Sequence, residues 1–119
     1  MSDGRSPRRG EIWSVDFEPV RGSETGKQRP ALVISSDGLS RLPVRIVVPL
    51  TGWQVKHDRY SWRVRIDPDA VNGLSKPSVA DVLQVRVVSL QRFNGYLGGV
   101  RAEQLAEVVA ALALIVEYE

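Results

Sequence analysis

Apolar and polar residues alternate along much of the chain, which predicts β-strands. In "EIWSVDF", residues 11–17, the side chains of Trp13, Val15 and Phe17 fall on one side, so this strand has one apolar face. Further strands are expected at residues 30–35, 45–51 and 60–66, and the valine-rich stretch "SVADVLQVRVV" predicts one long strand over residues 78–88.

The strand expected at residues 60–66 is amphipathic. Trp62, Val64 and Ile66 alternate with polar positions that include Arg63 and Arg65, so one face is apolar and the other is cationic. A cationic sheet face suits phosphate groups, and it equally suits contact with water alone. The pattern leaves both interpretations open.

Other elements are predicted by turn residues and by helical spacing. Residues 37–42 suggest a short helical turn, and Asn72 with Gly73 is a turn signal. Over residues 102–118 the apolar positions recur at helical spacing: Leu105, Val108, Val109, Leu112, Ile115 and Val116. Because this helix is apolar on more than one side, we expect it to cover its own sheet and to contact a partner subunit.

The pattern therefore predicts a mostly β fold with helices (α+β). We expect a strongly bent, barrel-like antiparallel sheet of five strands, closed by a C-terminal helix. The domain is expected to span residues 10–119. Residues 1–9 are rich in Gly, Ser, Pro and Arg, which predicts a mobile basic arm before it.

Composition narrows the class of protein. The chain has 119 residues, 43% hydrophobic and 25% charged, which is typical of one globular domain. It has no cysteine, which excludes disulfides, thiolate nucleophiles and zinc–thiolate sites. No signal-peptide pattern and no apolar run of roughly 18 residues is present, so we expect a soluble, cytoplasmic protein.

The basic residues are mostly arginine. The net charge is only +2, but 13 of the 16 basic residues are arginine, whose planar fork matches phosphate groups. This bias suits a nucleic-acid ligand, RNA or DNA. A genome rich in G·C base pairs explains the same bias equally well.

The titratable residues offer few candidates for catalysis. His57 is the only histidine, which excludes a two-histidine acid–base pair, and its polar surroundings predict a surface position. Asp16, Glu18 and Glu24 cluster at the end of the first strand and in the loop after it. Such carboxylates can do acid–base work, or they can simply form a solvated loop face.

"GSETGKQRP", residues 22–30, resembles a phosphate-binding P-loop only superficially. Gly22 and Gly26 enclose three residues where that motif needs four, and Lys27 is followed by Gln28 in place of Ser or Thr. A P-loop also opens a helix, whereas this stretch leads into an expected strand. The segment is therefore interpreted as a loop between two strands.

Longer motifs do resemble a known family. "RGEIWSVDFEPVRGSETGKQRPALVIS" is similar to the opening of the MazF/PemK toxin endoribonucleases, with their R-G-[DE]-I, D-x-x-P-x-x-G-x-E and R-P-hydrophobic-hydrophobic-V motifs. The resemblance continues in order downstream, with "VVPLT" at 47–51, "NGL" at 72–74, and Gln84 with Arg86. It covers nearly everything from Arg9 to the expected helix.

The resemblance implies a small SH3-like barrel of the CcdB/MazF type that acts as a homodimer. It implies the toxin of a type II toxin–antitoxin system, an mRNA interferase that cuts single-stranded RNA at short sequences without a metal ion or other cofactor. The ends expected are a 2′,3′-cyclic phosphate and a 5′-OH. It also implies inhibition by a cognate MazE-like antitoxin with an acidic segment, which competes with RNA at the loop of residues 17–28.

The resemblance carries catalytic roles onto Arg29 and Thr51. Because an arginine side chain stays protonated at any working pH, we expect Arg29 to act mainly by stabilising charge and Glu24 to position or deprotonate the 2′-OH. Five residues are expected to bind RNA: Lys27, Gln28, Trp53, Lys56 and Arg86. Trp53 is a candidate for base stacking, as are Trp13 and Tyr60.

Two other functions stay open from the sequence. One is a gyrase-binding toxin of the related CcdB type, but the charged end of this chain and the presence of the Arg29–Thr51 pair count against it. The other is a barrel that binds RNA without cleaving it. Leu83 supports this second alternative, because the family often has an acidic residue or cysteine at that position, and so does the uncommon basic arm of residues 1–9.

Overall fold

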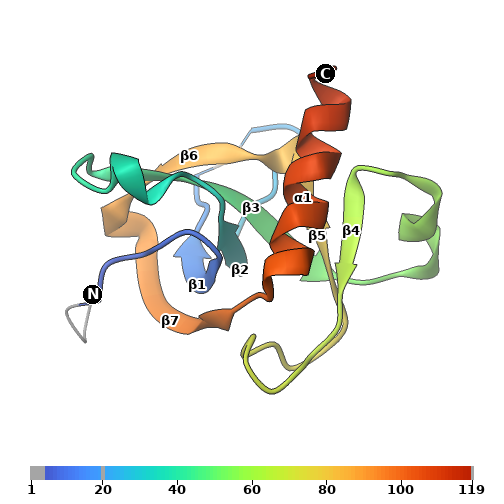
Figure 1. Ribbon diagram of the computed structural model, residues 1–119, viewed down its shortest axis with the longest axis horizontal. Helices are drawn as coiled ribbons and strands as arrows, with labels where there is room; N and C mark the ends of the chain where they lie inside the picture. The colour runs from blue at the N-terminus through green and yellow to red at the C-terminus, as the bar shows by residue number, and fades with distance from the viewer. Residues whose placement is uncertain (1–4, 20, 119) are drawn as a thin grey trace.

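The computed structural model describes residues 5–19 and 21–118, apart from the side chains of residues 58 and 59. In this part of the chain, strands form one bent antiparallel sheet and a C-terminal helix packs across it (Figure 1). The elements are β1 (Glu11–Asp16), β2 (Gln28–Val33), β3 (Val44–Gly52), β4 (Arg63–Ile66), β5 (Ser78–Asp81), β6 (Arg86–Ser89), β7 (Phe93–Gly99) and α1 (Ala102–Ile115). Short 3₁₀ turns lie at Asp37–Leu39, Val55–Arg59, Val82–Gln84 and Leu90–Arg92.

Strand β3 organises the sheet because it pairs with two strands along one edge. The order is β4-β5-β3-β2-β1-β7, and β6 also pairs with β3. Val44 to Val47 pair with β6, whereas Leu50 to Gly52 pair with β5. The two halves of β3 therefore belong to different parts of the bent sheet.

Two features of the β structure differ from the sequence-based expectation. The stretch 78–88 is not one strand, because the Asp81 carboxylate accepts a hydrogen bond from the backbone N–H of Leu83 at 3.1 Å and caps a 3₁₀ turn that separates β5 from β6. Strand β7 was not expected, because four of its seven residues are of types that disfavour strands: Asn94, Gly95, Gly98 and Gly99. The described residues thus form seven strands, not five, while the bent antiparallel sheet and its C-terminal helix are confirmed.

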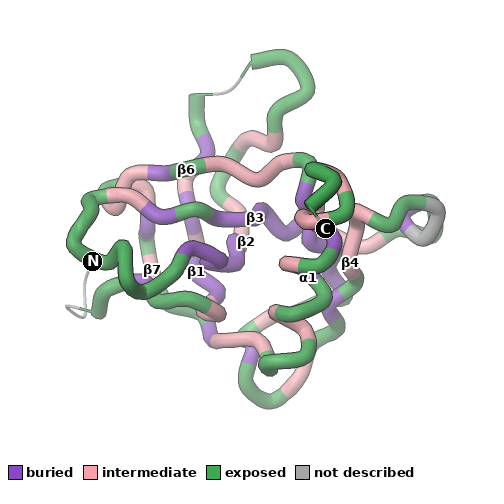
Figure 2. Tube along the Cα trace, turned by 45° about the horizontal axis from the view of Figure 1, so that its top comes forward, coloured by how far each residue is buried: buried purple, intermediate pink, exposed green. Residues whose placement is uncertain are grey.

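The sheet is buried on both faces near its centre (Figure 2). Trp13, Val15 and Phe17 are fully buried on one face, as their alternation predicts. Ile12 points the other way and is also fully buried, in the cluster that α1 closes with Val108. Strand β1 is therefore buried on one face at Trp13 and Val15 and on the other at Ile12, while Ser14 and Asp16 stay partly exposed. Among the described residues, no helix is long and apolar enough to cross a membrane.

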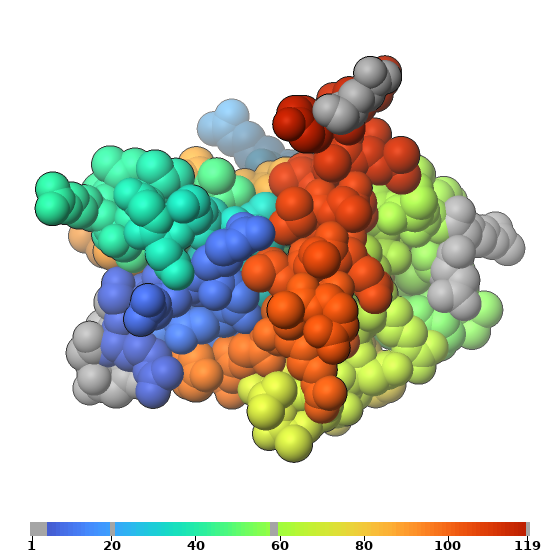
Figure 3. All heavy atoms as spheres, viewed as in Figure 1, coloured from blue at the N-terminus to red at the C-terminus, as the bar shows by residue number. Residues whose placement is uncertain are grey.

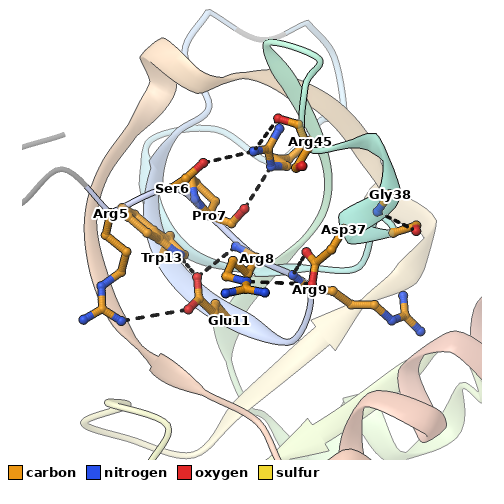
Figure 4. Close-up of polar contacts among 12 residues, drawn as sticks. Arg5, Ser6, Pro7, Arg8, Arg9, Glu11, Trp13, Asp37, Gly38 and Arg45 are labelled. Atoms are coloured by element: carbon orange, nitrogen blue, oxygen red, sulfur yellow. Dashed lines mark hydrogen bonds and ion pairs between the residues drawn. The ribbon is translucent and has the colours of Figure 1, made fainter.

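The N-terminal segment packs against the sheet from residue 5 onward (Figure 4). Arg45 is only 3% exposed and donates hydrogen bonds to the Pro7 carbonyl at 2.9 Å and to the Ser6 hydroxyl at 3.1 Å. The backbone N–H of Arg9 donates to the Asp37 carboxylate at 2.8 Å. Residues 5–9 of the expected mobile basic arm thus contact the sheet, because a buried guanidinium needs the acceptors that the segment supplies. Residues 1–4 of that expected arm lie outside the described residues.

Candidate active site and RNA-binding surface

The expected catalytic pair lies together at one end of the sheet. Strands β2 and β3 are antiparallel with Ala31 opposite Pro49, and the same register continued by two residues puts Arg29 opposite Thr51. Both residues line a recess of about 330 Å³, called here the Arg29–Thr51 recess. Its other lining residues are Gln28, Pro30, Leu50, Gly52, Gly73, Leu74, Ser75, Lys76, Ser78 and Leu97.

The guanidinium of Arg29 is only partly used by the protein. Its Nε atom donates to the Gly26 carbonyl at 2.9 Å, which fixes the side chain against the β1–β2 loop. Its two terminal amino groups have no hydrogen-bond or ion-pair partner among the described side chains and backbone. They are therefore available to an anionic group in the recess.

The "NGL" motif builds a wall of this recess. Asn72 is fully buried; its amide donates to the Asp67 carbonyl at 2.8 Å and accepts from the Leu74 N–H at 3.0 Å. Gly73 has φ of +69°, and a Cβ there would lie 2.1 Å from the Leu97 carbonyl oxygen. The turn thus approaches β7 so closely that only glycine fits.

The carboxylate of Asp69 stabilises the same turn. It accepts hydrogen bonds from the backbone N–H groups of Val71 and Asn72, each at 2.9 Å. The hydrogen bond from Val71 is the main reason that the pKa of Asp69 is held below its ordinary value of 3.8, with smaller contributions from Asn72 and the nearby Arg101.

Glu24 does not lie in the Arg29–Thr51 recess. It lines a second recess of about 320 Å³ together with Arg86, called here the Glu24–Arg86 recess, whose other lining residues are Ser23, Leu83, Gln84 and Val85. The Glu24 carboxylate accepts from the backbone N–H of Arg21 at 2.5 Å. The three residues expected to act in catalysis are therefore divided between two recesses.

Arg86 is held under the β1–β2 loop. Its guanidinium carbon lies 5.4 Å from the centre of the Phe17 ring, and its Nη1 atom is buried without a hydrogen-bond partner in the described structure. A buried donor without an acceptor is costly. Its position at the Glu24–Arg86 recess therefore suits an anionic or hydrogen-bond-accepting ligand.

Gln84 joins the two sides of the Glu24–Arg86 recess, a contact that the sequence did not reveal. Its side-chain amide accepts from the Thr25 N–H at 2.9 Å and donates to the Ser23 carbonyl at 3.2 Å. Both partners flank Glu24 in the chain. The only sequence signal was the position of Gln84 in the Q-hydrophobic-R motif.

Of the other residues expected to bind RNA, Gln28 lines the Arg29–Thr51 recess, and Lys27, Trp53 and Lys56 line neither recess. Gln28 donates to the Ser14 hydroxyl at 2.9 Å, and Lys27 is an exposed residue with φ of +66°, in the left-handed region. Lys56 is exposed in the turn Val55–Arg59. Trp53 follows the end of β3, and the Arg65 guanidinium carbon lies 4.0 Å from the centre of its ring.

Burial overturns the expectations for Trp13 and His57, and it leaves base stacking by Tyr60 a prediction. Trp13 is fully buried between Phe93 and Tyr96, so it cannot stack on a base. Tyr60 is 38% exposed and its ring stacks on Trp62 with 4.7 Å between the ring centres. His57 is 9% exposed and accepts from the Gln54 N–H at 2.9 Å, so its expected surface position is wrong: it caps a turn. In the described part of the chain, no three His, Asp or Glu side chains are grouped as a metal site requires.

Comparisons with known proteins show which family this chain is similar to. A model of the family "PemK-like, MazF-like toxin of type II toxin-antitoxin system" matches residues 8–116. The endoribonuclease MazF9 of Mycobacterium tuberculosis is 37% identical over 113 residues, which cover 90% of this chain and 93% of that protein. The structure of MazF from Deinococcus radiodurans is 26% identical, has a TM-score of 0.80, and is matched over 95% of this chain and 98% of that chain.

A second structure from the same organism contains a partner. The MazE-MazF structure from Deinococcus radiodurans is matched with a TM-score of 0.74 and 25% identity, over 97% of this chain and 99% of that chain. Family model, sequence and fold lead to the same assignment across almost the whole length. This chain belongs to the family of PemK-like, MazF-like toxins of type II toxin–antitoxin systems.

Proposed function

We propose that the protein is a metal-independent endoribonuclease that cleaves single-stranded RNA at a short recognition sequence. The observation that carries this proposal is the Arg29–Thr51 recess, in which a partly unused guanidinium and a hydroxyl line one surface. The endoribonuclease MazF9, which is 37% identical to this chain, supports the same reaction class.

The proposed reaction is an internal transesterification. The ribose 2′-OH attacks the adjacent phosphorus, the bond from phosphorus to the 5′ oxygen breaks, and the products carry a 2′,3′-cyclic phosphate and a 5′-OH. Negative charge grows on the non-bridging oxygens in the transition state. The free amino groups of Arg29 donate hydrogen bonds to these oxygens, and the hydroxyl of Thr51 adds a further donor.

Glu24 is proposed to position or deprotonate the 2′-OH. Because it lines the other recess, this role requires the β1–β2 loop to bring Glu24 towards Arg29 when RNA binds. The two residues are already linked through the loop, since Arg29 donates to the Gly26 carbonyl. Wild-type turnover in Glu24→Gln would remove this role while leaving the Arg29–Thr51 proposal intact.

RNA binding is proposed to extend over Lys27, Gln28, Trp53, Lys56 and Arg86. Three of these carry positive charge for phosphate groups, and Trp53 offers an aromatic face for a base. Bases of single-stranded RNA are read in pockets formed by loops, so the β1–β2 loop is the proposed reader of sequence. DNA is not part of this proposal.

Two protein partners are proposed as well. A MazE-MazF structure resembles this chain closely in fold, which supports a cognate antitoxin with an acidic segment that competes with RNA at the β1–β2 loop. A second copy of the chain is proposed to cover the outer side of α1, which stands exposed in Figure 3. Leu114, near the end of α1, and Val116, just after it, are 59% and 64% exposed.

The test is cleavage of a long unstructured RNA in EDTA, with the fragment ends mapped. We expect cuts at one recurring short sequence, with 2′,3′-cyclic phosphate and 5′-OH ends, that are lost in Arg29→Ala and Thr51→Ala. Arg8→Ala is the matched control, because Arg8 is exposed at the opposite end of β2 and pairs with Asp37. Intact RNA with the wild-type protein would overturn the proposal in favour of a barrel that only binds RNA, and cuts that persist in both site variants would overturn the assignment of the pair.

A further inference from the structure

We propose that Arg65, held over Trp53, forms a binding site for one nucleotide of the RNA strand next to the Arg29–Thr51 recess. The guanidinium stacks under the base, and its free edge contacts the phosphate. This inference rests on the proposed function, and it selects Arg65 from the cationic face that the alternation over residues 60–66 predicts.

Arg65 and Thr51 lie in one row across the sheet. Arg65 on β4 is opposite Val79 on β5, and Val79 is opposite Thr51 on β3. Residues paired in this way project to the same face of a sheet, and neighbouring strands are about 4.8 Å apart. The backbone of Arg65 is therefore about 10 Å from that of Thr51, close enough for a flanking nucleotide. Val64, between the two arginines of β4, packs on the opposite face against the core that α1 covers.

Trp53 lies between Arg65 and the recess. The pairing of β3 with β5 continues past Gly52, because the Trp53 N–H donates to the Pro77 carbonyl at 3.0 Å. Trp53 is two residues beyond Thr51 and so projects to the same face. The Arg65 guanidinium carbon is 4.0 Å from the centre of the indole ring, well inside the range of a cation–π contact.

Neighbouring residues orient the guanidinium of Arg65 but leave its two terminal amino groups available to a ligand. Its Nε atom donates to the Asp67 carboxylate at 2.8 Å, and no other hydrogen bond or ion pair engages it among the described residues. The side chain is 44% exposed. Single-stranded RNA is bound by stacking of its bases on aromatic rings and on arginine planes, combined with charge, and this pair offers both.

Neighbouring groups distinguish Arg65 from the other arginine of the strand. Arg63 lies 4.9 Å from the centre of the Tyr60 ring, but its side chain is only 25% exposed and pairs with Asp81 at 3.6 Å. Lys76 adds positive charge on the recess side, since its Nζ would lie 3.4 Å from a Cβ at Gly52. Arg65 is thus an exposed cation that lies against the Trp53 ring, on the same sheet face as the positively charged recess.

The experiment measures binding of an RNA oligonucleotide that carries 2′-deoxyribose at the mapped cleavage position, so that it cannot be cut. In a series of such oligonucleotides, the bases flanking this position are replaced one at a time by abasic sites. Binding is measured for the wild-type protein, Arg65→Gln, Arg65→Lys and the control Arg8→Gln, each first shown to keep the wild-type melting temperature. Like Arg65, Arg8 is paired with an aspartate.

We expect one abasic position to weaken binding to the wild-type protein about fivefold to a hundredfold, and to have little effect in Arg65→Gln. Arg65→Gln itself lowers affinity by a similar factor and reduces the slope of log affinity against log salt by about 0.7, the value for one phosphate of a single strand. Arg65→Lys restores the salt slope but not the sensitivity to the abasic site, because lysine has charge without a stacking plane.

The inference is overturned if every abasic position costs Arg65→Gln as much as it costs the wild-type protein, or if Arg8→Gln reproduces the losses. Its failure is separable from failure of the proposed function. Loss of cleavage in Arg29→Ala together with unchanged binding by Arg65→Gln would refute only the Arg65 site. If the wild-type protein cuts no RNA, the proposed function fails, and the same variants tested on unstructured RNA of mixed sequence still decide the Arg65 site.

Discussion

The β1–β2 loop is held in place by Gln84, and replacing Gln84 with leucine removes that support with little change in side-chain size. The amide of Gln84 accepts from the Thr25 N–H at 2.9 Å and donates to the Ser23 carbonyl at 3.2 Å. Leucine keeps the apolar stem and removes both hydrogen bonds. Because Ser23 and Thr25 flank Glu24, the change acts on the position of that carboxylate.

The two hydrogen bonds set the size of the effect. Each neutral hydrogen bond contributes about 0.5–1.5 kcal/mol net. Together they stabilise the observed loop conformation, called here closed, by about 1–3 kcal/mol relative to an open one in which Gln84 contacts neither Ser23 nor Thr25. This corresponds to a change of about fivefold to 150-fold in the ratio of closed to open loop. We expect the amide of Thr25 to exchange with solvent deuterium faster by this factor, while amides in β1 and β2 keep their wild-type rates.

Gln91→Leu is the matched control, because Gln91 is exposed and its side chain makes no hydrogen bond with the described residues. If the β1–β2 loop reads RNA, kcat/KM falls in Gln84→Leu and is unchanged in Gln91→Leu. The reasoning is refuted if the Thr25 amide exchanges at the same rate in the wild-type protein, in Gln84→Leu and in Gln91→Leu.

Four further predictions concern stability and the loop. Arg45→Met should lower the free energy of unfolding by about 2–4 kcal/mol, because several carbonyls lose a charged donor; urea unfolding measures it, and wild-type stability would contradict it. Gly73→Ala should be more destabilising than Gly22→Ala in thermal melts, because both have positive φ but only Gly73 meets the backbone of β7; equal melting temperatures would count against this. Lys27→Gly should raise the melting temperature, by relieving a backbone cost of about 1 kcal/mol, and weaken RNA binding; a lower melting temperature would be the opposite result. The lowered pKa of Asp69 means that its stabilisation is full above pH 3.8 and is lost as pH falls below that value, so Asp69→Asn should be less sensitive to acid in this range, and parallel acid-unfolding curves would refute it.

Much of the fold was predictable because local pattern and tertiary context agree. The alternation in β1 and the helical spacing in α1 both match the buried positions. The predictions failed where the local sequence pattern and the tertiary contacts favour different structures. Strand β7 contains three glycines and forms because its backbone pairs with β1, which no local pattern shows. The valines of residues 78–88 favour a strand, but the Asp81 side chain caps a turn in the middle of it.

The site was predictable only where its residues lie on regular strands. Arg29 and Thr51 come together because β2 and β3 pair in one register, and their motifs mark both positions. Glu24 lies in a loop whose path depends on distant contacts with Gln84, so nearness in sequence to Arg29 did not place it in the same recess. Trp13 failed as a stacking residue because Phe93 and Tyr96 of β7, a strand that no local pattern predicted, pack against its ring.

Strand β3 pairs with β6 along its first half and with β5 along its second half. We infer that the first half mainly stabilises the fold and that the second half forms part of the proposed active site. Its first half pairs with β6 and carries Arg45, buried under the N-terminal segment. Its second half pairs with β5 and leads from Thr51 to Trp53, where side chains face a recess and two arginines. A substitution at Arg45 should therefore shift the melting temperature without changing kcat/KM at temperatures where the protein is folded. A loss of kcat/KM in folded Arg45→Met would show instead that the two halves of the strand are coupled, and that the packed end of the sheet helps to set the geometry of the recess.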